Sequence, residues 1–281
     1  MAIAYQSLQS ANSLTAGTAL TITKPTGLAE GDLMIAFLFA GRNSNDWSTL
    51  TGWTKLGSTI DTDGTDSNLT VQMKIAEASD VAAANFSFTP HASHEEKYGA
   101  VVRLTGNFTP GISSLVQSRF DNDLAGTSPG GITPLGPNSI LFMAVNTHTN
   151  ALTSAYAVVN DNPTWTEIAD GVIDTAVDLS YAIAYAAYTA SGSTGVYSFT
   201  NSGGPGACLI SINEREDKTV TPSVLDLTIT VNTPTIGGSS TVSPSVLNLT
   251  ITVNTPTITS DADGWSNSTR NTGTWTNQLK S

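Results

Sequence analysis

Cysteine is almost absent from this sequence of 281 residues, which contains a single one, Cys208. One cysteine permits no intramolecular disulfide, and it rules out a zinc site built from cysteines. Cys208 lies in the apolar run of residues 207–210, so we expect it to be a small buried side chain.

Basic residues are also few. Lysine and arginine number 11 against 23 aspartates and glutamates, which gives a formal net charge of −12 at pH 7. This charge repels nucleic acid and no basic run offsets it, so we expect no polynucleotide partner. Charged residues make up only 12% of the chain, and neutral polar residues take their place, which is typical of a β protein with neutral polar faces.

Long apolar stretches are missing as well. The longest, residues 33–40, falls well short of the roughly 18 residues that a membrane helix needs, so we expect no membrane insertion. Residues 1–6 do not have the pattern of a secretory signal. The composition therefore indicates a protein made in the cytoplasm and released by lysis.

Motifs that carry catalysis are absent, including the nucleophile elbow, the Walker loop and the dinucleotide fingerprint. We expect no enzyme, no cofactor and no metal. His91 and His94 have a spacing that metal ligands use, but no third ligand is identifiable. Residues 61–66 alternate carboxylates as a calcium loop does, yet lack its bidentate glutamate. Carboxylates on distant strands leave a polysaccharide-degrading activity open.

Strand patterns dominate the N-terminal part of the chain. Residues 32–39 form a continuous apolar run between Gly31 and Gly41, which predicts a central strand buried on both faces. Alternation or bounded apolar runs predict further strands at residues 20–23, 69–76, 86–89 and 100–104. Residues 77–84 are the one helix-like stretch, and we expect a turn or a single helical turn there.

The same order of elements returns about 110 positions later. The corresponding segments are 33–40 and 140–145, 52–56 and 164–168, 69–76 and 179–188, 86–89 and 197–200, and 99–103 and 206–210. The pattern predicts two similar halves, either facing each other or forming two small sandwiches in tandem. We favour one jelly-roll-like or Ig-like antiparallel sandwich over residues 1–216, because facing sheets would bury both apolar runs more completely.

A second region, residues 217–258, begins after the charged segment 213–218, which predicts a linker. Residues 219–236 recur 22 positions later as residues 241–258 with two substitutions. Each copy has the alternation of a strand with one apolar face. These faces are formed by Leu225, Leu227, Ile229 and Val231 and by Leu247, Leu249, Ile251 and Val253. An isolated hairpin is marginal in water, so we expect these residues to form an assembly interface, as in a homo-oligomer.

Residues 259–281 form a polar tail with Trp265 and Trp275 ten residues apart. Tryptophan is frequent at interface hot spots, so we expect both to anchor the tail in a neighbouring subunit, and the alternative is a tail folded onto its own domain. Among the other tryptophans, Trp47 is the candidate for a glycan contact. Trp53 and Trp165 occupy equivalent places in the two halves, which favours a role in the core.

Residues 30–36, 51–54 and 100–102 are similar to β-sandwich modules of tailed-bacteriophage structural proteins. Residues 265–278 resemble short Trp-Thr-Asn-Gln repeats of phage virion proteins. The resemblance implies a non-enzymatic virion component of the fibre, tail or capsid-decoration type, bound to other virion proteins. An alternative is a host-attachment protein that binds a receptor or a host-surface glycan.

Overall fold

The computed structural model describes residues 3–41, 46–61, 67–92, 94–108, 115–122, 130–136, 138–147, 163–174, 179–190, 192–195 and 206–213. The chain divides into two units, Met1–Glu216 and Asp217–Ser281. The division falls in the charged segment in which the sequence predicts a linker. All described residues belong to the first unit, so the two strand repeats and the tryptophan tail lie outside them.

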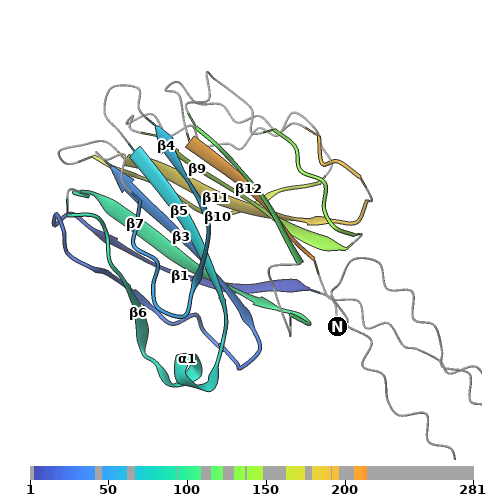
Figure 1. Ribbon diagram of the computed structural model, residues 1–281, viewed down its shortest axis with the longest axis horizontal. Coiled ribbons are helices and arrows are strands. Elements are labelled where there is room, and N and C mark those ends of the chain that lie inside the picture. The colour runs from blue at the N-terminus through green and yellow to red at the C-terminus, as the bar shows by residue number, and fades with distance from the viewer. Residues whose placement is uncertain are drawn as a thin grey trace, which may run out of the picture. The chain divides into compact units, whose positions relative to one another are not determined.

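The first unit is an antiparallel β sandwich, as predicted (Figure 1). One sheet has the order β1 (Ala4–Ser13), β7 (Lys97–Thr105), β3 (Leu33–Gly41), β5 (Ser67–Ile75), β4 (Thr54–Asp61). The other has the order β10 (Thr166–Ile173), β11 (Leu179–Tyr188), β9 (Ser139–Thr147), β12 (Gly206–Asn213), β8 (Val116–Asp121). A small sheet pairs β2 (Leu20–Thr23) with β6 (Asn85–Phe88), and α1 (Ala78–Ala82) is the single helical turn expected there.

The two large sheets have the same strand order when each is read from its first strand. In each sheet, the strand that comes first in the chain pairs with the strand that comes last (β1 with β7, β8 with β12). The strand that comes second in the chain lies at the centre of the sheet (β3, β9). One sandwich therefore contains both halves, rather than two sandwiches in tandem. The repeated order of segments predicts this equivalence, while a common origin of the halves stays a prediction.

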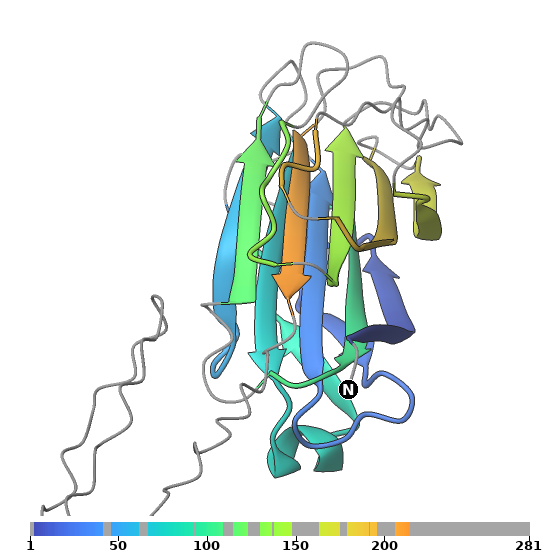
Figure 2. The same cartoon turned by 90° about the vertical axis from the view of Figure 1, so that its right-hand side faces the viewer.

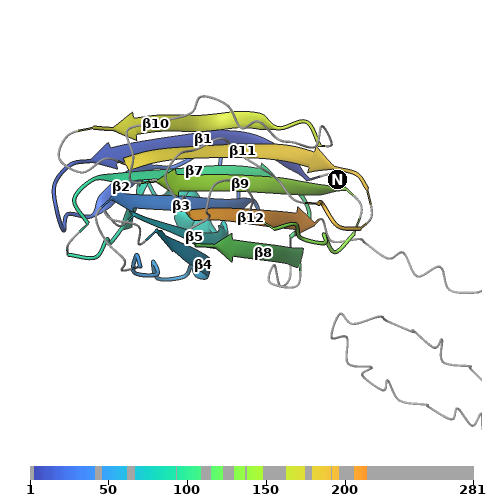
Figure 3. The ribbon, with the colours of Figure 1, turned by 90° about the horizontal axis from the view of Figure 1, so that it is seen from above.

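The sheets stack face to face with corresponding strands at opposite margins. Figure 3 shows β1 and β10 along one margin and β4 and β8 along the other. β4 packs on β8 and β12, and β3 packs on β9 and β11. Because β3 and β9 also run in the same direction (Figure 2), an approximate twofold axis parallel to the strands relates the two sheets.

The main core lies between the sheets and takes apolar residues from both. Its fully buried members include Leu33, Ile35, Phe37, Leu69, Val71, Val102, Phe142, Leu179, Ile183, Cys208 and Ile210. The rings of Phe37 and Phe142 meet across the sheets with centroids 5.8 Å apart. Cys208 is buried as predicted, and burial raises the pKa of its thiol to about 12, so the thiol is not a nucleophile at neutral pH.

Both sheets are also covered on their outer faces. The β2–β6 pair and the segment that follows β3 cover the first sheet, in a cluster that contains Ile22, Leu38 and Phe88. A smaller cluster with Ile132 and Leu141 covers the second sheet. Every residue of β3 and of β9 is buried for this reason, which confirms the prediction of a central strand buried on both faces.

The sandwich has two distinct ends. At the loop end, defined by Gly41, Thr147 and Gly206, β3 and β9 stop and β12 starts. At the opposite end, which we call the exit end and define by Ala4 and Asn213, β1 starts and β12, the last described strand, stops (Figure 2). Among the described residues, no helix is long and apolar enough for a membrane span.

Candidate functional site

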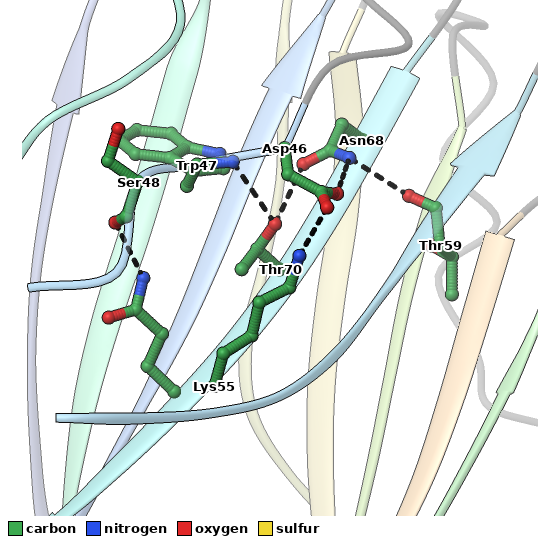
Figure 4. Close-up of polar contacts among 8 residues, drawn as sticks. Asp46, Trp47, Ser48, Lys55, Thr59, Asn68 and Thr70 are labelled. Atoms are coloured by element: carbon green, nitrogen blue, oxygen red, sulfur yellow. Dashed lines mark hydrogen bonds and ion pairs between the residues drawn. The ribbon is translucent and has the colours of Figure 1, made fainter.

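The most extensive polar cluster of the described residues lies on the outer face of β5. Alternate residues of β5 point into the main core, and the outer face carries Asn68, Thr70 and Gln72, all fully buried, followed by the partly exposed Lys74. Buried amides and hydroxyls need hydrogen-bond partners. Thr70 and Gln72 find them in the backbone of residues 46–50, which lies across the strand (Figure 4). Asn68 bonds the Asp46 side chain, the Thr59 carbonyl and the Thr70 hydroxyl.

Three hydrogen bonds of its backbone attach this segment to β5, and a fourth bond links two side chains of β5 to each other. The backbone N–H of Trp47 donates to Thr70 Oγ1 over 3.4 Å, and the Thr70 hydroxyl donates to Asn68 Oδ1 over 3.1 Å. The backbone N–H of Leu50 donates to Gln72 Oε1 over 2.9 Å, and Gln72 Nε2 donates to the carbonyl of Ser48 over 3.0 Å. The polar side chains of β5 therefore bind backbone instead of water.

A charged pair closes the cluster toward solvent. Lys55 of β4 forms an ion pair with Asp46, whose other oxygen accepts a hydrogen bond of 3.3 Å from Asn68 Nδ2. Burial opposes the charge on Asp46, but hydrogen bonds from Lys55, Ser58 and Asn68 outweigh it and lower the pKa of the carboxyl group. Because both charged side chains are partly exposed, this pair positions residue 46 more than it stabilises the fold.

The cluster continues across to the second sheet at the loop end. Asn146 of β9 accepts a hydrogen bond of 3.2 Å from Thr59 Oγ1, and its Nδ2 donates to Ser67 Oγ over 2.7 Å. All three side chains are fully buried. A Cβ atom at Gly206 would lie 2.4 Å from Thr59 Oγ1, so this contact requires a glycine there. Asn146 therefore fixes how the two sheets meet at the loop end.

The prediction that Trp47 contacts a glycan is wrong. Its side chain is only 2% exposed, packs in the outer cluster of the first sheet and lies 5.4 Å from the ring of His94. The hydrogen bonds from β5 draw residues 46–50 over the sheet, and this places the indole beneath the segment. Its Nε1–H is buried without a hydrogen-bond partner among the described residues.

The other two sandwich tryptophans pack as their equivalence predicts. Trp53 is 6% exposed and meets Phe86 and Phe88 edge to face, with ring centroids 5.6 and 5.4 Å away. Trp165 is half-buried and packs on the outer cluster of the second sheet. Trp53 therefore covers the outer face of the first sheet, and Trp165 covers the outer face of the second sheet.

The His91 and His94 pair is a packed turn. The backbone N–H of His91 donates to His94 Nδ1 over 3.3 Å, and His94 is fully buried. Within the described ranges, no three His, Cys, Asp or Glu side chains are grouped to hold a metal ion. Residues 62–66 and the side chain of Asp61 lie outside the described part of the chain, so the calcium-loop pattern of residues 61–66 is not tested.

Lys97, which the sequence does not single out, is a fully buried cation beside this turn. Its ammonium donates to the backbone carbonyls of His94 (3.3 Å), Glu95 (3.1 Å) and Thr15. Burial lowers its pKa. The three carbonyls tie the turn to the chain that follows β1, so Lys97 stabilises the loop end of the first sheet.

Stacked tyrosines fill the space between the sheets near the β1 margin. Tyr98 and Tyr181 stack with ring centroids 3.6 Å apart, and Tyr5 and Tyr185 stack at 4.5 Å. Burial raises the pKa of Tyr181 to about 12, and the charge of Asp170 adds to this rise. A phenol with so high a pKa stays protonated at neutral pH, so Tyr181 serves packing rather than proton transfer.

The predicted assembly residues all lie outside the described ranges. They are Leu225, Leu227, Ile229, Val231, Leu247, Leu249, Ile251, Val253, Trp265 and Trp275. Their role stays a prediction. The described residues thus bring together a polar cluster that organises the loop end, and a packed margin of tyrosines.

No family model, curated protein or solved structure matches the chain. The resemblance to phage virion proteins therefore rests on the sequence segments alone.

Proposed function

We propose that the chain is a structural protein of a bacteriophage virion, a fibre, tail or capsid-decoration component that acts by assembly and surface display. The observation that carries the proposal is the separation of the two ends of the sandwich. The chain continues into residues 217–281 from Asn213 at the exit end, while Gly41, Thr147 and Gly206 mark the opposite end. Assembly is assigned to the region that follows the exit end in the chain, and display to the loop end.

The chemistry of the two units supports the same two roles, display by the sandwich and assembly by residues 217–281. The sandwich satisfies buried polar groups of β5 and β9 internally and needs no disulfide, so it suits an exposed position on a particle. Residues 219–258 repeat an apolar strand face twice, and such a face is stabilised when another chain covers it. The tail tryptophans would add anchoring area to this interface.

Host attachment through a glycan has weaker support. The burial of Trp47 removes the residue on which that alternative depended. Every aromatic side chain in the described part of the chain is buried or half-buried, so none presents a fully exposed ring for sugar stacking. Structural assembly is therefore the function that the observations favour.

The test is to locate the protein on particles. Particles purified from a lysate of the source should be labelled by immunogold with an antibody against residues 1–216. A chain that lacks residues 219–281 should stay soluble but fail to join them. If particles carry no label, the proposal is wrong, and if the shortened chain joins them normally, the C-terminal anchor is wrong.

A matched pair of double variants tests whether incorporation depends on the apolar face of the repeats or only on the presence of residues 219–258. Leu227→Asp with Leu249→Asp puts charge on the face that we expect to be covered, and incorporation should be lost. Thr228→Asp with Thr250→Asp puts the same charge on the opposite face, and incorporation should persist. Equal loss in both pairs would contradict an interface formed by the apolar face.

A further inference from the structure

The sandwich has four edge strands, β1, β4, β8 and β10, each paired with one neighbour only. An edge strand presents unpaired backbone N–H and C=O groups, which can pair with another chain. Proteins commonly protect such edges with charged side chains, bulges or short strands. The four edges of this sandwich differ in that protection.

Three of the edges carry charge. β4 contains Lys55 and Asp61, β8 contains Arg119 and Asp121, and β10 contains Glu167 and Asp170. β4 and β10 are also interrupted by register shifts, and β8 is only six residues long. By these criteria all three are protected.

β1 is different. Its ten residues include no charged side chain, and none of them is buried. After one register shift near Tyr5, its pairing with β7 runs without interruption from Ser7 to Ser13. Among the described residues, no backbone hydrogen bond outside the strand ladders involves β1. Its outer edge is therefore long, uncharged and open to a new strand.

We propose that β1 pairs antiparallel with β1 of a second copy of this chain, across a twofold axis normal to the first sheet. The partner is the same strand because a twofold contact brings each edge against itself. Self-pairing of β10 would bring its two acidic side chains against their copies, and self-pairing of β4 or β8 would require their charged side chains to lose water, whereas β1 has no charge to repel its copy or to desolvate.

The side chains of β1 suit such pairing. Asn12 is exposed, and its amide both donates and accepts hydrogen bonds, so it can bond a polar side chain across strands. Ser10 is also exposed, and its hydroxyl bonds Tyr98 of the neighbouring strand. The contact joins the two first sheets into one continuous sheet. It assigns a dimer interface within the sandwich itself and does not depend on the repeats of residues 219–258.

The neighbouring strand β10 makes the contact sensitive to salt. β10 lies along the same margin as β1 (Figure 3), so the twofold axis also brings the two β10 strands toward each other. Glu167 and Asp170 then repel their copies, and salt screens this repulsion. Dimerisation through β1 should therefore strengthen as the salt concentration rises.

Hydrogen exchange of the full-length chain at low and high protein concentration tests the proposal. Backbone amides of β1 should become more protected as the concentration rises, while those of β4, β8 and β10 should not change. Asn12→Lys adds a charge at an exposed position of the edge, and the concentration dependence should be lost. Equal unfolding midpoints in urea would show that the variant is folded.

The matched control is Ser118→Lys on β8, the strand with the corresponding place in the second sheet, where Ser118 is exposed. This variant should keep the protection of β1. The proposal is overturned if β1 amides exchange equally fast at every concentration, or if Asn12→Lys leaves their protection intact. Association with unprotected β1 amides would overturn it too, and would leave assembly through residues 219–281 standing.

Discussion

The outer faces of the two sheets are covered in different ways although their strand orders are the same. On the first sheet, Asn68, Thr70 and Gln72 of β5 hydrogen-bond the segment that covers them. On the second sheet, the corresponding strand β11 presents Ala182, Ala184 and Ala186, all buried. One cover is attached by polar side chains along the length of a strand. The other packs closely on alanines and is attached by polar side chains only at strand ends, Tyr188 of β11 and Asn213 of β12.

The cover of the second sheet is held by bonds within itself and by side chains at the ends of β11 and β12. Ile132 and Thr194 exchange hydrogen bonds of 2.8 and 3.0 Å, and the side chain of Asn213 bonds the backbone at Leu135 and Gly136. The comparison teaches that the strand order depends on the inner faces. The outer faces can differ, provided that each satisfies the buried polar groups of its own cover.

The largest expected effect tests the equivalence of the inner faces. Phe37→Ala and Phe142→Ala should each lower the free energy of unfolding by about 3–5 kcal/mol, since both rings are fully buried. Because the rings contact each other, the double variant should lose less than the sum. Urea unfolding of residues 1–216 measures both. A negligible effect of one variant would show that the inner faces are not equivalent.

The next effect exploits the difference between the outer faces. Gln72→Ala should cost about 2–4 kcal/mol, because the N–H of Leu50 and the carbonyl of Ser48 lose their partners. Ala182→Gln places the same amide in the other half and should cost about 1–3 kcal/mol by overpacking. Gln117→Ala on exposed β8 is the control and should be near neutral in the same urea unfolding experiment. If Ala182→Gln stabilises the protein, the two covers are interchangeable.

The smallest expected effect is a loss of stability that appears only at high pH. The pKa of Tyr181 is about 12 in the folded protein against an ordinary value of 10.0. Above pH 10 the unfolded chain loses this proton first, so stability that is complete below that pH falls as the pH rises toward 12. Tyr181→Phe should make the fall shallower, as measured by urea unfolding across this window. Cys208, whose pKa is also raised to about 12, loses its proton over the same pH window in the wild-type protein and in the variant, so it does not affect their difference. An unchanged slope would contradict the burial of the phenol.

The central strands could be predicted from sequence because their apolar runs identify them without knowledge of their neighbours. Residues 33–40 and 140–145 are such runs, and each became the middle of a sheet. β1 was not predicted, since residues 4–13 contain few large apolar side chains and owe their conformation to pairing with β7. Its position at an edge is a property of the fold, not of its local composition.

The polar cluster could not be predicted for a related reason. The composition indicates neutral polar faces in contact with water, yet Asn68, Gln72 and Asn146 are fully buried. Whether a glutamine in an alternating strand meets solvent or a covering segment depends on where distant residues fold. The same contact decides the burial of Trp47, whose own neighbours in sequence look like an exposed loop.

The position of β12 has a mechanical consequence. This strand leads to residues 217–281 from Asn213, and it lies between β8 and β9 rather than at an edge. A force that pulls on the chain beyond Asn213 while the loop end is held runs along the strand. It therefore loads the ladders on both sides of β12 in shear, so many hydrogen bonds share the tension, whereas an edge strand would peel away one bond at a time.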